Sequence, residues 1–532
     1  MSSNASESMT ATQPRRRLLM ARVRLRGRRR SVRAGVLLAL GLIVATAIGA
    51  GLRLYQLQAH SLWADELYTL RAIVADGYAS PVWRGWSHWA STLSLRLGGA
   101  ELAAAEPYEP WHWRGLGMTP WNARLGPAIV GIASIPILAL LALPMLGRRG
   151  AVMLALLMAV APWHIEWSQN ARFYIALFLA SGAFIALYYH GSRTGSRKHV
   201  VAAAICLLIA FMHHAPAIFL LGVLAADWLV TRLAGRRLRL GGFGYGVMGA
   251  AAGLCAVLMA LDLAVLNPSW EHLAEQPRSH GPAMLVAGTL YMGHVALMTL
   301  AAVTAWLLMR NRRRLGWYLA LTALVPLATL LYLTATDQMF VHTRYGFYAY
   351  FAWLALAATG LAACYRQLRP RFGTLFACAP AAVVLVALLQ ISLFYHSGGA
   401  GFRSMWGQAF AWLDERAAAD EPVLTSFTLA GFYYLQAGPP RVVSFPASAH
   451  ELDEHAAEAL AAAGGGRGVW LVTAATAAQG RQAEAWIDEL AELKAYFDTR
   501  IEQPHSSVRV YWYEPGGDAG TEPPRAQGED GV

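Results

Sequence analysis

The chain has 532 residues, of which 56% are hydrophobic and 14% are charged, and its mean hydropathy is +0.37. These values exclude a large soluble enzyme and are typical of a polytopic membrane protein. The net charge of +12 does not indicate nucleic-acid binding, because Lys and Arg stand in short blocks between apolar runs.

The N-terminal segment, residues 1–33, is rich in arginine and precedes the first apolar run. Arginine in this position is typical of a tail that is retained in the cytoplasm. No cleavage site built of small residues follows the apolar run, so we expect a retained anchor rather than a signal peptide.

Apolar runs near the length of a membrane-spanning helix follow along most of the chain. They predict eleven spans at about 34–53, 124–146, 150–165, 171–190, 199–212, 215–231, 241–264, 284–308, 316–335, 346–365 and 373–396.

The distribution of basic residues gives these spans an orientation. With the N-terminus in the cytoplasm, every inside connection carries a basic cluster, at residues 148–149, 193–198, 232–239, 310–314 and 366–371. The short outside connections carry only Arg172, Arg278 and Arg344. The positive-inside rule therefore predicts a multi-pass membrane protein whose N-terminus is cytoplasmic and whose C-terminal part is on the outer face, periplasmic or extracellular.

The first outer loop, residues 54–123, is long and rich in tryptophan. Trp83, Trp86 and Trp89 recur every three residues, so a helix would place them on one face and lie in the membrane interface. A plain aromatic belt is the alternative, and the two are compatible.

After residue 396 the composition becomes that of a soluble domain. Amphipathic patterns predict helices over Met405–Ala418 and Arg481–Ala495, and apolar runs predict strands over Pro422–Phe427, Val469–Thr473 and Val508–Tyr513. We expect a small α/β domain over residues 397–515 on the outer face, followed by a disordered tail at 516–532.

The four cysteines lie in or beside apolar segments, and none forms a CxxC motif. We interpret them as small core residues rather than as metal ligands or disulfide partners.

Four polar clusters lie at the predicted outer ends of spans and could converge on one cavity. They are Asp65 with Glu66, the segment Trp163–Tyr174, His213 with His214, and the segment His342–Tyr348. Ionisable side chains at such boundaries usually mark where a substrate or an ion is handled.

This chemistry suits transfer from a lipid-phosphate sugar donor. A carboxylate such as Asp65 can deprotonate or orient an acceptor hydroxyl or amine. Arg172 and Arg344 can bind the leaving phosphate through their planar guanidinium groups. The structural alternatives are arginines that reach the interface, a histidine pair that ends a helix, and a Glu66 that caps a helix or faces water.

Three segments resemble a known family, the polyprenyl-phosphate-dependent glycosyltransferases of the GT-C fold. The similarity is greatest to the bacterial relatives of protein O-mannosyltransferases and of the lipid A aminoarabinose transferases. The segments are RLYQLQAHSLWADELYTL, NARLGPAIVGIASIPILALLALPMLGRRG and APWHIEWSQNARFYIALF, and TRYGFYAYFAWLALAATGL fits more loosely. The resemblance covers roughly residues 34–396.

The resemblance implies roles for particular residues. Asp65 would be the catalytic base or the carboxylate that orients the acceptor, and Glu66 would assist it. The residues implied in substrate or lipid-phosphate binding are Arg172, Tyr174, His213, His214, Arg344 and Tyr345.

The chain also departs from the family's pattern. Asn170 replaces the glutamate of the signature Ser-Gln-Glu-Ala-Arg-x-Tyr, so an acid role at that position is lost. The family's His-Pro-Pro segment has only Ser80-Pro81 as its nearest equivalent, and an insertion around Gly99–Trp121 follows it. The identity of the acceptor therefore does not transfer from the family.

The sequence thus predicts a membrane glycosyltransferase that moves a hexose or pentose from a polyprenyl-phosphate donor to a cell-envelope glycan, lipid or protein on the outer face. The alternatives are a transporter or flippase of a lipid-linked saccharide and a membrane scaffold with a partner-binding tail. We expect no nucleic-acid partner and no cofactor; a divalent metal on a carboxylate–histidine site stays open, although no spacing indicates one.

Overall fold

The structure is a computed structural model. It describes residues 35–74, 88–102, 109–261, 281–336, 341–396, 405–444, 468–474, 491–497 and 507–514. The predicted cytoplasmic tail at 1–33 and the predicted disordered tail at 516–532 lie outside the described residues. Trp83 and Trp86 also lie outside them, so the interfacial helix expected there stays a prediction.

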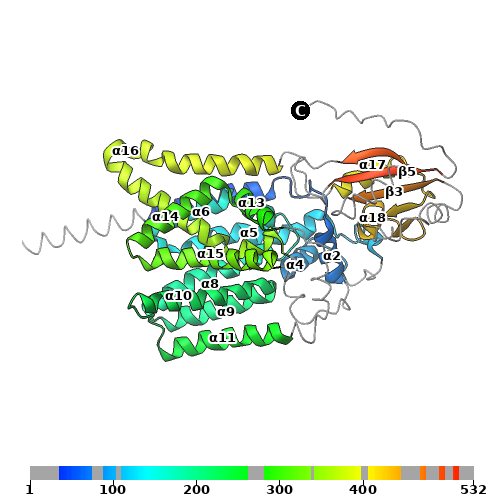
Figure 1. Ribbon diagram of the computed structural model, residues 1–532. Helices are drawn as coiled ribbons and strands as arrows, with labels where there is room; N and C mark the ends of the chain where they lie inside the picture. The colour runs from blue at the N-terminus through cyan, green and yellow to red at the C-terminus, as the bar shows by residue number, and fades with distance from the viewer. Residues whose placement is uncertain are drawn as a thin grey trace, which may run out of the picture.

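Most of the described chain is a bundle of roughly parallel and antiparallel helices (Figure 1). The first apolar helix is Gly35–Leu54. The helices of the bundle that follow are α5 (Pro120–Leu141), α6 (Leu143–Val160), α7 (Pro162–Ser168), α8 (Tyr174–Thr194), α9 (Arg197–His213), η3 (Ala215–Ile218), α10 (Phe219–Leu233), α11 (Gly241–Leu261), α13 (Pro282–Gly293), α14 (Val295–Arg310), α15 (Arg314–Ala335), η5 (Thr343–Ala349) and α16 (Tyr350–His396).

Eight helices of the described chain are long and apolar enough to cross a membrane, or nine if the bent pair α13 and α14 forms one span. Three features explain why this count of spans is lower than the predicted eleven. Helix α9 has only 17 residues, α13 and α14 meet at 93°, and α16 continues through a break at Gly373. The fold is therefore polytopic and helical, and the count of eleven stays a prediction.

Two glycines make the sharp reversals in the arginine-rich connections. Gly147 inside α6 has φ 70°, and Gly373 inside α16 has φ 78°. A residue with a Cβ rarely adopts this left-handed backbone conformation, so glycine suits both turns. They fall where the sequence separates the span pairs 124–146 and 150–165, and 346–365 and 373–396.

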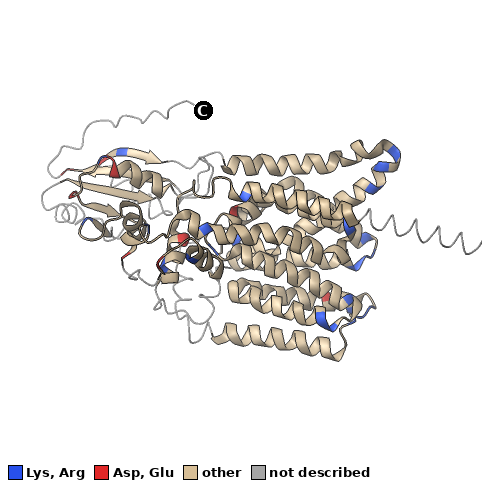
Figure 2. Cartoon of the chain, turned by 180° about the vertical axis from the view of Figure 1, so that it is seen from behind, with Lys and Arg blue, Asp and Glu red and all other residues tan. Residues whose placement is uncertain are grey.

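Lys and Arg gather at the end of the bundle that lies away from the C-terminal sheet (Figure 2). Several of these guanidinium groups lie over aromatic rings, as Arg149 does over Tyr365 at 5.3 Å from the ring centre. The other end carries the outer loops and their short helices α2 (Ala64–Val74), α4 (Trp89–Leu97) and η2 (Pro110–His112).

The C-terminal residues form the expected α/β domain. Its elements are α17 (Trp406–Asp414), β1 (Val423–Thr425), α18 (Thr428–Leu435), β2 (Val442–Ser444), β3 (Val469–Ala474), β4 (Glu492–Phe497) and β5 (Val508–Tyr513). The sheet order is β2-β1-β3-β5-β4, with β1 parallel to β2 and β3, and β5 antiparallel to β3 and β4.

One predicted element of this domain is wrong where it can be compared. Glu492–Ala495, the end of the helix expected over Arg481–Ala495, belongs to strand β4, and residues 481–490 lie outside the described residues. Strand β5 pairs with β3 on one side, and β4 pairs with its other side. Such pairing outweighs the weak helical preference of this short stretch.

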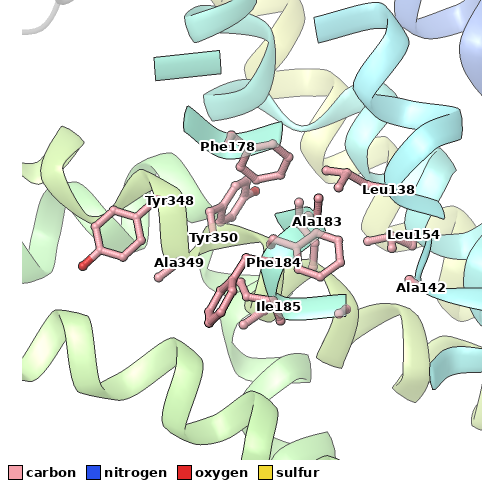
Figure 3. Close-up of a cluster of buried hydrophobic side chains, with 14 of the residues drawn as sticks. Leu138, Ala142, Leu154, Phe178, Ala183, Phe184, Ile185, Tyr348, Ala349 and Tyr350 are labelled. Atoms are coloured by element: carbon pink, nitrogen blue, oxygen red, sulfur yellow. The ribbon is translucent and has the colours of Figure 1, made fainter. Parts of the chain in front are cut away.

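The two largest of the four apolar clusters hold most of the described residues together. The core of the bundle contains large buried rings, among them Phe178, Phe184, Tyr348 and Tyr350, which pack against small residues such as Ala183 (Figure 3). Small residues let helix backbones approach closely where no hydrophobic effect drives them together.

The second core joins the outer loops to the C-terminal domain. Leu62, Leu67 and Trp113 of the first loop pack in one cluster with Phe410 and Tyr433 of α17 and α18. The sheet domain is therefore attached directly to the segment that carries Asp65, and it lies beyond part of the outer-loop end of the bundle (Figure 1).

Candidate active site

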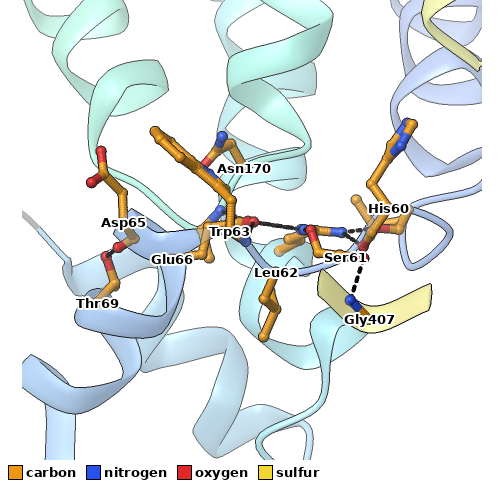
Figure 4. A network of polar contacts seen from close by, with 12 residues as sticks. His60, Ser61, Leu62, Trp63, Asp65, Glu66, Thr69, Asn170 and Gly407 are labelled. Atoms are coloured by element: carbon orange, nitrogen blue, oxygen red, sulfur yellow. Dashed lines mark hydrogen bonds and ion pairs between the residues drawn. The ribbon is translucent and has the colours of Figure 1, made fainter. Parts of the chain in front are cut away.

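The adjacent carboxylates Asp65 and Glu66 lie in the first turn of α2. The helix begins after Trp63, whose carbonyl accepts from the N–H groups of Glu66 at 2.9 Å and Leu67 at 3.1 Å. Negative charge at this end is favoured by the helix dipole. Consecutive residues of a helix are about 100° apart, so the two carboxylates point in different directions (Figure 4).

Asp65 lies between two guanidinium groups that come from distant parts of the chain. Its Oδ2 is 3.2 Å from Nη2 of Arg344 and 3.7 Å from Nη2 of Arg172. Arg172 also donates to the Asp65 carbonyl and to Thr69 Oγ1, both at 3.1 Å. The Asp65 side chain is 22% exposed, although its Oδ2 atom, which faces the two arginines, is buried.

Aromatic rings surround the three charges. The Arg344 guanidinium lies 5.2 Å from the centre of the Trp63 ring, and Arg172 lies 4.9 Å from that of Phe173. The His214 ring contacts Tyr174 at 5.4 Å and Tyr345 at 5.0 Å between ring centres. These rings exclude water from the site, which lowers the local dielectric constant and strengthens interactions with a bound charged group.

The charges fix the protonation states of two groups outside the spans. Burial opposes ionisation of Asp65, but Arg344 and then Arg172 outweigh it and hold the pKa of the carboxyl below its usual value. Burial, helped by the same two arginines, lowers the pKa of His214 to about 3. At neutral pH, Asp65 is therefore a carboxylate and His214 is a neutral imidazole.

The structure thus brings Asp65 together with five of the residues named from the sequence, namely Arg172, Tyr174, His214, Arg344 and Tyr345. His213 has other contacts: its Nδ1 lies 2.7 Å from the Ile209 carbonyl, and its Nε2 accepts from Trp89 Nε1 at 3.2 Å. These contacts are those of a hydrogen-bonded residue at the end of a helix.

Glu66 contacts a different arginine. Arg124 donates from Nε to Glu66 Oε1 at 2.8 Å and from Nη2 to Oε2 at 2.6 Å, and both side chains are fully buried. Glu66 also accepts from the N–H groups of Ala171 at 2.7 Å and Trp63 at 3.4 Å. Its contacts therefore fix where α2 begins, whereas the side chain of Asp65 is partly exposed.

Sequence reasoning assigned no role to Arg124 or Arg53. Arg124 stands in the quoted segment NARLGP as the only charge of the 22-residue helix α5, which could have marked it. Arg53 is fully buried and donates to the Met158 and Ala159 carbonyls at the end of α6, at 2.8 and 3.0 Å, and contacts His164 Nδ1 at 2.6 Å. Arg53 is likewise the only charge of its helix, Gly35–Leu54, but it stands at the helix end, where an arginine that reaches the interface is also expected.

Asn170, which replaces the family's glutamate, lies beside the site. Its Oδ1 accepts from Trp63 Nε1 at 3.4 Å, so it helps to orient the ring beneath Arg344. In the part of the chain that the structure describes, no group of three or more His, Cys, Asp or Glu side chains is arranged to hold a metal ion.

Solved structures with the same arrangement of helices are known. The chain is similar to ArnT from Cupriavidus metallidurans in the apo state, with a TM-score of 0.57 and 15% identity. The match covers 91% of this chain and 98% of the ArnT chain. The same enzyme bound to undecaprenyl phosphate matches over 90% and 97%, with a TM-score of 0.51 and 15% identity. The fold is the GT-C fold.

A second GT-C structure is similar over much of its length. The archaeal oligosaccharyltransferase AglB from Archaeoglobus fulgidus, in complex with an inhibitory peptide and a dolichol-phosphate, matches over 87% of this chain and 73% of its own, with a TM-score of 0.51 and 14% identity. No protein-family model and no curated protein matches the chain. The resemblance found in the sequence is therefore confirmed at the level of the fold.

The buried pair of Glu66 and Arg124 predicts large and non-additive effects of substitution on stability. Glu66→Gln or Arg124→Met each leaves one charge buried without its partner, so each should lower the free energy of unfolding by about 3–5 kcal/mol. The double variant should lose clearly less than the sum of the two. Unfolding in detergent measures all three, and an additive double variant would contradict the assignment.

The pair of arginines predicts a shift in the pH dependence of activity. Removing Arg344 leaves burial less opposed, so the pKa of Asp65 should rise in Arg344→Gln. If Asp65 is the base that the sequence predicts, it acts only when ionised, so the acid limb of kcat/KM should move to higher pH. Arg416→Gln, which removes an exposed arginine paired with Glu415, is the control. An acid limb that stays in place in Arg344→Gln would show that Asp65 is not the titrating base.

Proposed function

We propose that this protein is a membrane glycosyltransferase that moves a sugar from a polyprenyl-phosphate donor to a cell-envelope glycan, lipid or protein. The observation that carries the proposal is the partly exposed carboxylate of Asp65 between the guanidinium groups of Arg172 and Arg344. One group can activate an acceptor, and the other two can bind the phosphate that departs.

Arg172 and Arg344 each have an N–H donor that could bind a phosphate oxygen. Within the described residues, the buried Nε atoms of Arg172 and Arg344 have no acceptor. A guanidinium offers five N–H donors in a fork that matches phosphate oxygens. Both side chains are mostly buried, at 17% and 13% exposed, so an incoming phosphate would be bound in a poorly hydrated place where the attraction is strong.

A small apolar pocket lies beside Arg344. Thr343 and Gly346, on either side of Arg344 in the sequence, line it. Its other walls include Trp163, Leu285, Leu330 and Trp353. The GT-C structures support this choice of donor, because one was solved with undecaprenyl phosphate and another with a dolichol-phosphate.

In the proposed mechanism, Asp65 accepts the proton of the acceptor hydroxyl or amine as that atom attacks the anomeric carbon. The bond between this carbon and the phosphate oxygen breaks, and Arg172 and Arg344 stabilise the charge on the polyprenyl phosphate that leaves. His214, which is neutral, and the hydroxyl groups of Tyr174 and Tyr345 would supply further hydrogen bonds. Glu66 would assist by fixing the position of α2 through Arg124 rather than by touching the substrate.

The charge distribution supports an outer-face reaction. The Lys- and Arg-rich turns lie at the end of the bundle away from the site and the sheet domain (Figure 2). By the positive-inside rule, that end would face the cytoplasm of a bacterial inner membrane, and the site would face the periplasm.

The test is transfer of label from a panel of radiolabelled polyprenyl-phosphate sugars, with the purified protein in lipid and cell-envelope extract as acceptor. Asp65→Asn keeps the shape of the side chain but not its basicity, so we expect a rate at least 10²-fold lower, within the range that general base catalysis contributes. Glu415→Gln, at an exposed carboxylate of the C-terminal domain, should retain the full rate.

Either of two results would overturn the proposal. A folded Asp65→Asn protein with the rate of the wild type would exclude Asp65 as the base. Label that stays on the lipid with every donor, while the lipid itself crosses the bilayer, would favour a transporter or flippase of a lipid-linked saccharide.

A further inference from the structure

The C-terminal domain contacts the backbone directly before Asp65. In α18, the hydroxyl oxygen of Tyr434 accepts from the Leu62 N–H at 2.6 Å, and the hydroxyl lies 3.3 Å from the Leu62 carbonyl, to which it donates. Leu62 stands three residues before Asp65 and one residue before Trp63, after which α2 begins. One side chain of the distant domain therefore satisfies both backbone groups of this residue.

A second contact holds the neighbouring residue. Ser61 Oγ donates to Gln408 Oε1 at 2.5 Å and accepts from the Gly407 N–H at 3.0 Å, so α17 binds the residue before Leu62 (Figure 4). The approach is close, because a Cβ added at Gly407 would lie 2.8 Å from Ser61 Oγ. Only glycine allows this contact without a shift of one of the two segments.

The same short segment is held from its other side by the bundle. Arg124 donates to the carbonyls of His60 at 2.8 Å and Ser61 at 2.9 Å while it binds Glu66. The start of α2 is therefore clamped between α5 of the bundle and α17 and α18 of the C-terminal domain. The Asp65 carbonyl accepts from Thr69 Oγ1 at 2.9 Å and from Arg172 at 3.1 Å, within α2 and the site. The position of Asp65 therefore depends on where the first turn of α2 lies, and this clamp holds the backbone that leads into that turn.

Aromatic packing makes the domain side of the clamp stiff. Tyr434 stacks on Phe410 with 6.2 Å between ring centres, and Phe410 stacks on Trp406 at 5.9 Å. Trp406 contacts Phe427, which lies edge-on to Tyr68 of α2 at 5.7 Å. The domain thus contacts the start of α2 at two places. Tyr434 holds Leu62 directly before the helix, and Phe427 packs against Tyr68 one turn into it.

We infer that the C-terminal domain positions the catalytic carboxylate, and that Tyr434 is the positioning residue through which it does so. This inference rests on the proposed function of Asp65. It assigns the domain a part in the chemistry, in addition to any contact that it makes with an acceptor. Displacement of a reacting group by about 1 Å can cost about 10²-fold in rate, so a few hydrogen bonds suffice for this role.

The neighbouring residue Tyr433 provides a matched control. It lies on the same helix, is fully buried, and donates through its hydroxyl to the Met118 carbonyl at 2.9 Å. Met118 precedes α5 and lies in the first loop, not in the segment before Asp65. Tyr434→Phe and Tyr433→Phe therefore remove the same atom from the same helix and differ in what that atom holds.

The experiment uses the full chain in lipid nanodiscs, with hydrogen exchange of the Leu62–Leu67 amides and transfer kinetics measured for both variants. In Tyr434→Phe we expect faster exchange in this segment, a kcat about 10–100-fold lower and an unchanged KM for the donor, because the arginines are untouched. In Tyr433→Phe we expect exchange in this segment and kcat close to those of the wild type.

A folded Tyr434→Phe protein with the kcat and exchange of the wild type would overturn the inference. Equal losses of kcat in both variants would also overturn it, because they would report general destabilisation. A wild-type protein without transfer activity would instead refute the proposed function. In that case, the exchange of Leu62–Leu67 still decides whether Tyr434 holds this segment.

Discussion

The buried pair of Glu66 and Arg124 is the interaction on which the arrangement of the site depends. Two charges removed from water cost several kcal/mol each, and the cost is offset only when the geometry is good and every remaining donor and acceptor is used. Here the contact is bidentate, and the spare donors of Arg124 bind the carbonyls of Leu57, His60 and Ser61. The pair therefore joins helix α5, the backbone before α2 and the first turn of α2 in one rigid unit.

The same pair also places the cation that faces Asp65. Glu66 accepts from the N–H of Ala171, and the next residue is Arg172. A single buried carboxylate thus fixes two neighbouring residues, Asp65 on one side and Arg172 on the other, whose side chains meet in the site. Successive residues of a helix point in directions about 100° apart, so the carboxylate of Glu66 points into the buried pair and that of Asp65 points into the site. The two acidic residues are equivalent in the sequence and have different environments in the fold.

The sequence predicted the convergence of the site better than it predicted the role of each member. Asp65, Arg172, His214 and Arg344 could be brought together because the alternation of spans places all of them at outer helix ends. The environments of Glu66 and His213 could not be predicted, since they depend on Arg124 and Trp89, which are distant in the chain. Strand β4 was missed for a related reason, because its pairing with β5 is a tertiary contact that its own residues do not encode.

The central claim, that the two arginines bind a lipid phosphate beside Asp65, is tested most directly by a cryo-electron microscopy structure of the wild-type protein in nanodiscs with a polyprenyl phosphate. The account predicts a phosphate within hydrogen-bonding distance of both Arg172 and Arg344. A phosphate bound elsewhere, with the contacts of Asp65 to both arginines unchanged, would contradict it.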